Sequence, residues 1–370
     1  MTEQFKNQSS RTTVRDVAEA AGVSVGTVSA VINARGSVRD VTRRRVMEVI
    51  GRLNYELPRA VGMGGGGRRA KSIGLMVKEA RNPFYADILL GVRAELAERG
   101  YTLFEGTSEG TYREEGRVLE AFRDHGIAGA IVAPVVEDAS DLSHLFLIQR
   151  RGYPLVLLGE IRGLPVPSVT VDNVRAEKAA VQYLLDGGHE RILHVSGPAY
   201  SQHSQDRVAG VKEAFSESSL RFHEGMVVEG GAGLEDGYRV VREVFGRGGD
   251  RPTAITCFND LVAIGALRAL NELGLSVPGD VSVVGYDDIE MAAYLPTPLT
   301  TIHVPTREMG HRAADLLLRQ LDGEASETPE HVLLDAELVV RSSTRQGAGT
   351  RIEPGGKPSL VLVRPAVDQQ

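Results

Sequence analysis

The chain has 370 residues, of which 42% are apolar, and its formal net charge is −7. This length predicts two or three domains of a globular protein. No apolar run approaches the roughly 18 residues of a membrane-spanning helix, and the polar first residues do not resemble a secretory signal. A single cysteine, Cys257, excludes an internal disulfide framework. We therefore expect a cytoplasmic protein with no membrane partner.

The net charge conceals an asymmetry along the chain. Residues 1–71 hold 13 Lys and Arg against 6 Asp and Glu, whereas the remainder holds 29 against 43. A basic segment attracts DNA and an acidic body repels it. The distribution therefore indicates that any contact with DNA is made by the N-terminal segment.

Residues 13–33 follow a polar arm, 1–12, that we expect to be disordered. Thr13 and Asp16 have the spacing of a capping box at the start of a helix, and Gly22 stands where a helix ends in a left-handed residue. Ser24 is a good cap for a second helix, whose apolar residues recur at helical spacing. Two short helices joined by such a turn are typical of a helix-turn-helix, whose second helix lies in the DNA major groove.

A third helix is predicted from Asp40 to Asn54. Its apolar residues, expected to face the first two helices, are Val41, Val46, Val49, Ile50 and Leu53. A glycine-rich segment follows, and from residue 72 buried strands alternate with helices. This alternation predicts parallel sheets covered by helices on both faces. The expected strands are 72–77, 101–106, 129–134, 154–159, 168–173, 191–197, 226–231, 253–259, 281–288, 299–305 and 331–341.

The run DVAEAAGVSVGTVSAVIN (16–33) closely resembles the DNA-binding headpiece of the lac repressor (LacI/GalR) family. Further matching stretches are NPFY (82–85), VDN (171–173), FND (258–260), VPGDVSVVGYDD (277–288) and TPLTTI (297–302). The resemblance covers about residues 12–345. It implies a small all-α helix-turn-helix headpiece and an α/β bilobal, periplasmic-binding-protein-like effector domain of two doubly wound parallel sheets.

The resemblance also implies domain boundaries. These are a headpiece at 13–57, a hinge at 58–71, an effector-binding and dimerisation domain at 72–345, and a disordered tail at 346–370. Within the effector domain, lobe one is expected at about 72–170 and 299–325, and lobe two at about 171–298 and 326–345. The tail has no leucine heptads and so predicts no tetramerisation helix.

By similarity to the family, Val25, Gly26 and Ala30 enter the major groove, while Thr27 and Ser29 suit phosphate or mixed contacts. Ala30 replaces an Arg that is frequent in the family, so we expect a different operator sequence. In the hinge, four consecutive glycines disfavour a helix. Either the hinge helix ends near Met63, which would then wedge into the minor groove, or the segment is a flexible linker. The expected DNA-binding residues are Thr13, Val14, Ser24, Val25, Gly26, Thr27, Ser29, Ala30, Asn33, Arg43, Pro58 and Met63.

Ligands of open α/β sheets bind at the carboxyl ends of the strands. The residues expected there, with the roles that the family implies, are Phe84, Tyr85, Glu160, His203, Arg207, Asn259 and Asp287. Several alternatives stay open. Asp287 and Asp260 are possible helix caps, Asn82 is better explained as a cap than as a ligand contact, and Tyr85 is a possible core residue.

We thus expect a sequence-specific transcriptional regulator, most simply a homodimeric repressor that binds a near-palindromic operator of double-stranded DNA. A small-molecule effector, such as a sugar or a sugar derivative, would bind between the lobes and change the affinity for DNA. The alternative is a solute-binding protein with no DNA role, because the same fold serves both. Motifs for phosphate loops, nucleophile elbows and metal ligands are missing, so we expect no enzyme activity, no cofactor and no metal.

Overall fold

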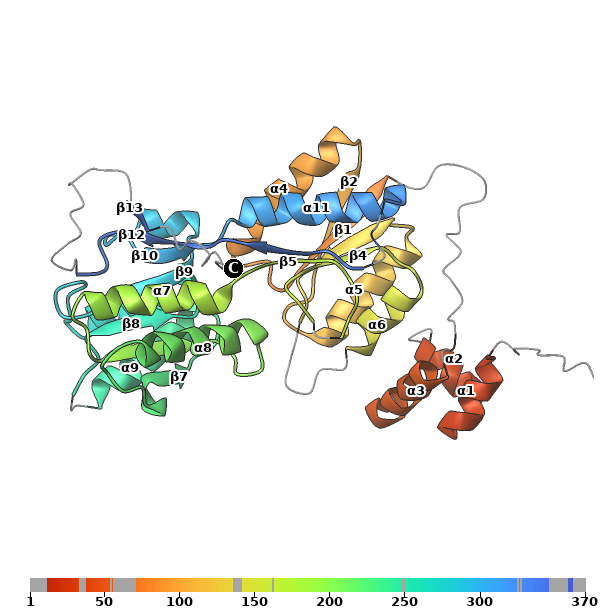
Figure 1. The fold of residues 1–370 in the computed structure, drawn as a ribbon, viewed down its shortest axis with the longest axis horizontal. Coiled ribbons are helices and arrows are strands. Elements are labelled where there is room, and N and C mark those ends of the chain that lie inside the picture. The colour runs from red at the N-terminus through yellow and green to blue at the C-terminus, as the bar shows by residue number, and fades with distance from the viewer. Residues whose placement is uncertain are drawn as a thin grey trace, which may run out of the picture.

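A computed structural model describes residues 12–32, 38–53, 55, 71–135, 142–161, 163–247, 250–324, 326, 328–345 and the backbone of 359–361. These residues form a helical headpiece and two α/β lobes that lie side by side (Figure 1). In the described part of the chain, none of the helices has the length and apolar character needed to cross a membrane.

The headpiece has the expected helix-turn-helix. Its helices are α1 (Val14–Ala21), α2 (Val25–Ile32) and α3 (Asp40–Arg52). Thr13 forms the predicted capping box: its backbone N–H donates to the Asp16 carboxylate at 2.6 Å, and its hydroxyl accepts from the Asp16 N–H at 3.4 Å. Gly22 ends α1 with a φ of 63°, a left-handed conformation that favours glycine. The turn between α1 and α2 is therefore determined by local sequence.

A small apolar core holds the three headpiece helices together. Val17, Val28, Val46 and Ile50 are completely buried in it. Val41, which we expected to face this core, is 74% exposed, because it lies in the first turn of α3, outside the apolar cluster. Leu147 from lobe one joins the headpiece cluster instead and is 5% exposed. One side of the headpiece thus packs against lobe one.

Lobe one is built on a six-stranded parallel sheet in the order β11-β5-β4-β3-β1-β2. Its central strands are buried along their whole length, as expected for parallel strands covered on both faces. The strands are β1 (Ser72–Val77), β2 (Thr102–Thr107), β3 (Gly129–Val132), β4 (Leu155–Leu158), β5 (Ser168–Val171) and β11 (His331–Leu334). The helices are α4 (Phe84–Glu98), α5 (Tyr112–Asp124), α6 (Ser143–Arg150) and α11 (Thr306–Asp322).

Lobe two contains a seven-stranded sheet in the order β13-β12-β10-β9-β8-β6-β7. Its strands are parallel except for β12 and β13, which pair antiparallel with their neighbours. The strands are β6 (Ile192–Ser196), β7 (Val227–Glu229), β8 (Ala254–Cys257), β9 (Ser282–Asp287), β10 (Thr300–His303), β12 (Glu337–Val340) and β13 (Ser359–Val361). The helices are α7 (Asn173–Asp186), α8 (Gln202–Ser216), α9 (Leu234–Gly246) and α10 (Asp260–Glu272), with short 3-10 turns η1 (Glu224–Met226) and η2 (Glu290–Ala293).

The chain crosses between the lobes three times, at β5 to α7, β10 to α11 and β11 to β12. Two of the expected lobe boundaries are therefore wrong. Residues 299–305 do not return to lobe one, because β10 pairs with β9 of lobe two, with Ile302 opposite Tyr286. Residues 331–341 are not one strand of lobe two, because β11 pairs with β5 in lobe one and only β12 joins lobe two.

Helices α4 and α11 cover one face of the lobe-one sheet and touch at two glycines (Figure 1). A Cβ on Gly91 would lie 2.0 Å from the carbonyl oxygen of Arg307. A Cβ on Gly310 would lie 2.2 Å from the carbonyl oxygen of Ile88. These two positions therefore set how closely the helix backbones approach each other.

Three expectations concern chain ends and linkers. The arm was expected to extend to residue 12, but the hydroxyl of Thr12 donates to the carbonyl of Leu53 at 3.1 Å, which anchors it to the headpiece. The tail was expected to be disordered from 346, but β13 adds a strand to the edge of the lobe-two sheet. The structure does not describe residues 1–11, 58–70 or most of the tail. The helix considered for the hinge segment therefore lies outside the described residues.

Candidate DNA-binding surface and effector site

The start of α2 forms the exposed edge of the headpiece. Ser24 caps it, since its Oγ accepts a hydrogen bond from the Thr27 N–H at 3.1 Å and lies 2.9 Å from the Thr27 hydroxyl. Val25, the first residue of this helix, is 42% exposed. An exposed, capped helix start with its N–H groups facing outward is suited to contact DNA phosphates and base edges.

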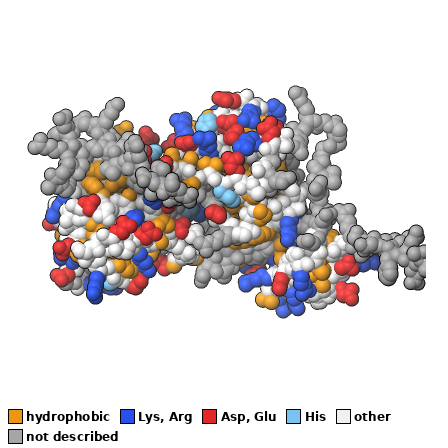
Figure 2. All heavy atoms as spheres, viewed as in Figure 1, with side chains coloured by type: hydrophobic (Ala, Val, Ile, Leu, Met, Phe, Trp, Pro, Cys, Tyr) orange, Lys and Arg blue, Asp and Glu red, His pale blue; other side chains and the backbone are white. Residues whose placement is uncertain are grey.

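The structure describes nine of the expected DNA-binding residues, eight of them on or beside α1 and α2 and the ninth, Arg43, on α3. Thr13, Ser24, Val25, Gly26 and Ser29 are exposed, whereas Val14, Thr27, Ala30 and Arg43 are partly buried. Asn33, Pro58 and Met63 lie outside the described residues. Basic side chains gather on the headpiece in Figure 2, where α3 carries Arg43, Arg44, Arg45 and Arg52.

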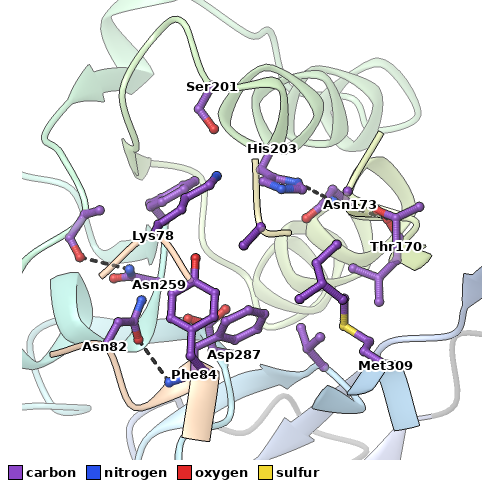
Figure 3. A pocket seen from close by; sticks show the side chains of 18 of the residues that line it. Lys78, Asn82, Phe84, Thr170, Asn173, Ser201, His203, Asn259, Asp287 and Met309 are labelled. Atoms are coloured by element: carbon purple, nitrogen blue, oxygen red, sulfur yellow. Dashed lines mark hydrogen bonds between the residues drawn. The ribbon is translucent and has the colours of Figure 1, made fainter. Parts of the chain in front are cut away.

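The second candidate site is a cavity between the lobes, lined from both sheets. Strands β1, β4 and β5 of lobe one and β8, β9 and β10 of lobe two direct their carboxyl ends toward it. Figure 3 shows the side chains that line it. The residues at these ends are Lys78, Gly159, Asn173, Phe258, Asn259, Asp287 and Val304. The position is the one expected for ligands of open α/β sheets.

Arg207 lines this cavity and is only 7% exposed. Contacts with two rings and two hydrogen bonds hold its guanidinium group. Its guanidinium carbon lies 3.4 Å from the ring centroid of Tyr286 and 4.7 Å from that of Phe258. Its Nε donates to the Oδ1 of Asn173 at 3.1 Å, and one terminal nitrogen donates to the carbonyl of Phe258. A guanidinium has five N–H donors, so three remain for a ligand within the described part of the structure.

Asp287 ends β9 and also lines the cavity. Its backbone has a φ of 110°, which is strained for a residue with a side chain. Burial raises the pKa of its carboxyl to about 7, although the positive charge of Arg207 acts in the opposite direction. The cap of η2 is Ile289, so Asp287 is not the helix cap that the sequence left open. Its carboxylate accepts no hydrogen bond from any described residue.

The remaining cavity residues differ in character. Burial, assisted by the nearby charges of Lys78 and Arg207, lowers the pKa of His203 to about 3, so its imidazole is neutral at pH 7. Its Nδ1 lies 3.3 Å from the amide nitrogen of Asn173. Burial and the nearby Asp287 raise the pKa of Tyr85, whose ring packs edge-on against Phe84. Both rings line the cavity and also contact the core.

The structure changes the roles expected for two neighbouring residues. We expected Asn259 to be the ligand contact and Asp260 the cap, but Asn259 caps α10 and also donates to the carbonyl of Ala232 at 2.9 Å. Asp260 is fully buried and accepts from the N–H of Ile289 at 2.9 Å and the hydroxyl of Thr301 at 2.6 Å. Asn259 therefore faces the cavity with its amide already bonded to protein.

Two further expectations concern the rim. The side chain of Asn82 accepts a hydrogen bond from the N–H of Phe84, the first residue of α4, at 3.0 Å, and Asn82 also lines the cavity. Glu160 is exposed and lines an outer extension of the cavity with Pro198 and Tyr200, not the inner part around Arg207. Within the described ranges, no three His, Cys, Asp or Glu side chains converge as a metal site would require.

Comparison with known proteins identifies both parts of this architecture. Residues 13–57 match the model of bacterial regulatory proteins of the lacI family, and residues 181–344 match a periplasmic binding protein-like domain. The repressor PurR of Aliivibrio fischeri (strain MJ11) is 32% identical over 333 residues, which are 90% of this chain and 98% of PurR. The chain belongs to the lacI family.

Other lacI-family proteins show the same similarity. The regulator DegA of Bacillus subtilis (strain 168) is 31% identical over 90% of this chain and 98% of DegA. A structure of the transcriptional regulator CelR in complex with cellobiose superimposes with a TM-score of 0.72 at 32% identity, covering 90% of this chain and all of CelR. The lac repressor dimer bound to operator gives 0.67 at 27% identity, over 90% of this chain and 99% of that one.

This lacI-family chain is thus a helix-turn-helix transcriptional regulator of the repressor type with an effector-binding domain, and its relatives are regulators, not enzymes. A solute-binding protein without a DNA role is excluded, because the similarity to repressors extends through the headpiece.

Sequence reasoning on this lacI-family chain missed several cavity residues. Lys78 directly follows a buried strand, and Asn173 belongs to a stretch that matched the family, so both carried a usable signal. Met309 comes from α11, more than 200 residues from Lys78, and nothing local marks it. Met309 reaches the cavity only because the chain crosses from β10 in lobe two back to α11 in lobe one.

Proposed function

We propose that this regulator binds a near-palindromic operator as a homodimer and that a small-molecule effector in the interlobe cavity changes its affinity for that operator. The observation that carries the proposal is a cavity lined by residues of both lobes, with an anchored Arg207 that retains free donors. A ligand that contacts both lobes favours one arrangement of the lobes over another, which is the requirement for coupling to DNA.

The proposed DNA contacts follow the helix-turn-helix geometry. Val25, Gly26 and Ala30 face base edges, and Thr27 and Ser29 face phosphates or both. Val25 and Ala30 offer apolar contact to a thymine methyl group but no hydrogen bond. The remaining proposed contacts are Thr13, Val14, Ser24, Asn33, Arg43, Pro58 and Met63. Because transcriptional regulation takes place at the DNA, we place the protein in the cytoplasm.

Relatives support a dimer and a hydrophilic effector. The lac repressor was solved as a dimer bound to operator, CelR was solved with cellobiose, and a lacI-family regulator of Enterococcus faecium was solved with ribose. We extend both features, the dimer and the hydrophilic effector, to this chain. In the dimer, two headpieces read two half-sites related by a two-fold axis. Phe84, Tyr85, His203, Arg207 and Asp287 contact the effector, with Asn259 beside it and Glu160 at the rim.

The first test is selection of binding sites from a random duplex pool, with the full-length protein at near-physiological salt. We expect an enriched palindrome whose half-sites have fixed spacing. Half-sites with variable spacing would contradict a dimer that holds its two headpieces at a fixed distance on the DNA. No enrichment above the salt-sensitive background would contradict sequence-specific binding in the absence of a corepressor.

The second test measures coupling. Effector affinity is titrated on the free protein and on its complex with the selected operator. Coupling free energies between sites are typically about 1–3 kcal/mol and reciprocal, so the two affinities should differ by about 5- to 150-fold. Equal affinities would show that the cavity ligand does not regulate DNA binding.

A further inference from the structure

One cation in the interlobe cavity, Lys78, has no counterion among the residues that the structure describes. Lys78 is the first residue after β1, and its carbonyl accepts a hydrogen bond from the Gly110 N–H at 2.9 Å, which fixes its backbone. Figure 3 shows its side chain in the cavity, on the side of Ser201 and His203. In the structure as described, its ammonium group has no hydrogen bond and no carboxylate within 4.0 Å. A ligand is therefore free to take this position.

The neighbouring carboxylates do not satisfy Lys78. Glu115 is completely buried. Its Oε2 accepts a hydrogen bond from the Val135 N–H at 2.7 Å, and its Oε1 lies 2.7 Å from the His144 Nε2. Glu79 is exposed and forms no ion pair with any described residue. Burial consequently lowers the pKa of Lys78, even though both glutamates act in the opposite direction. Lys78 is partly buried, and an anion bound beside its ammonium group offsets the cost of that partial desolvation.

A second cation faces the same cavity. Three N–H donors of Arg207 have no acceptor among the described residues, and Arg207 is near enough to Lys78 to lower its pKa further. Three carboxylates, Glu160, Asp172 and Asp206, line only the outer extension of the cavity. Lys78 lines this outer extension as well, and Glu79 and Asp287 line the inner cavity. An acid group on a ligand is thus attracted to Lys78 and Arg207 and repelled by the carboxylates around them, so its position in the cavity is restricted.

Asp287 adds a complementary requirement. Its carboxyl group faces the cavity without a donor from the described residues, so a well-matched ligand supplies one or more hydroxyl groups. Phe84 and Met309 provide apolar surface for the carbon skeleton. The cavity thus combines a site for a negative charge, an acceptor for hydroxyls and an apolar wall.

We propose that the effector is an anionic polyol, a sugar acid or a sugar phosphate, whose acid group binds Lys78 and Arg207 while its hydroxyl groups donate to Asp287. This inference rests on the proposed effector site and names the class of ligand that fills it. Lys78 and Arg207 together then distinguish an acid from the corresponding neutral sugar.

The test uses matched probes on the full-length protein. Hexoses, the uronates and aldonates derived from them, and their 6-phosphates are compared by thermal stabilisation and then by calorimetric titration. We expect at least one acid to bind about tenfold or more tightly than its neutral parent, as hydrogen bonds to charged groups allow. The uronates and aldonates test a sugar acid as the ligand, and the 6-phosphates test a sugar phosphate.

Lys78→Met keeps most of the aliphatic stem and removes the charge. Because Arg207 remains, we expect it to reduce the advantage of the acid over its neutral parent without abolishing it, while Lys212→Met, at an exposed lysine outside the cavity, leaves both affinities unchanged. Acids that bind no better than their parents, no binding by any acid, or unchanged affinity in Lys78→Met would each overturn the proposal.

This outcome is separable from failure of the proposed function. An acid that binds in a Lys78-dependent manner but leaves operator affinity unchanged would refute regulation by the cavity ligand and retain the assignment of the ligand class. A neutral sugar that alters operator affinity would retain regulation and refute the assignment.

Discussion

The side-chain oxygen of Asn173 accepts a hydrogen bond from the Nε of Arg207 at 3.1 Å, and this bond joins the interlobe cavity to a crossing between the lobes. Asn173 is the first residue of α7 and lies two residues after the end of β5, the strand with which the chain leaves lobe one. The same oxygen accepts from the hydroxyl of Tyr286 at 3.1 Å. A ligand that forms hydrogen bonds with Arg207 is therefore connected, through Asn173, to the segment between β5 and α7. The position of that segment depends on the angle between the lobes.

Asn173→Ala removes the acceptor shared by Arg207 and Tyr286. Because both donors are buried, we expect the free energy of unfolding to fall by about 1–3 kcal/mol. Urea unfolding of the full chain measures this change. Asn271→Ala, at an exposed asparagine of α10, is the matched control and should stay within about 0.5 kcal/mol of the parent. Equal stability of the two variants would show that the shared acceptor contributes little.

Gly310→Ala tests the close packing of α4 and α11. The added methyl group would lie 2.2 Å from the carbonyl oxygen of Ile88, so the helices must separate. We expect a loss of about 1–3 kcal/mol in unfolding free energy, typical of overpacking. Gly246→Ala, whose methyl group would meet nothing within 4 Å, is expected to be neutral or slightly stabilising. A thermal melt of each variant compares them, and no difference between them would contradict the close contact.

Asp287 makes the ligand-free protein less stable at high pH. Its pKa is raised by burial to about 7 in the folded state, above the ordinary value of 3.8. Its contribution to stability is therefore fully present below pH 4 and is lost as the pH rises through 7. We expect Asp287→Asn, which does not titrate, to gain stability relative to the parent from pH 5 to pH 8.

The comparison is made by urea unfolding of both proteins across that range. The difference between them isolates Asp287 from other buried groups such as His203, whose pKa burial lowers to about 3. A difference that stays constant from pH 5 to pH 8 would show that the Asp287 carboxyl keeps its ordinary pKa.

Thr13→Ala removes the capping box of α1. Loss of such a cap typically costs about 1 kcal/mol, which corresponds to about fivefold faster local opening. We expect faster amide hydrogen exchange at 14–21 and unchanged exchange in α10 of lobe two. Exchange that is unaltered in α1 would show that packing of Val17 and Ala21, both buried, holds this helix without its cap.

The helix-turn-helix could be predicted closely because its determinants are local. The capping box at Thr13, the left-handed Gly22 and the cap at Ser24 each act within a few residues, and all three are present in the structure. The alternation of buried strands and helices similarly predicted two parallel sheets, since a parallel strand is apolar on both faces. The sequence by itself therefore determined the helix-turn-helix and the alternation of strands and helices, and its charge asymmetry predicted which end of the chain contacts DNA.

Tertiary structure alone decided which lobe the late segments join and which residues meet in the cavity. An apolar strand such as β10 fits either sheet, and only pairing with β9 assigns it to lobe two. Asn259 and Asp260 are both plausible caps, and only the approach of Ile289 and Thr301 buries the second one. Lys78 and Met309 share a cavity because two chain crossings bring their elements together. These outcomes depend on contacts between residues far apart in sequence, which no local pattern specifies.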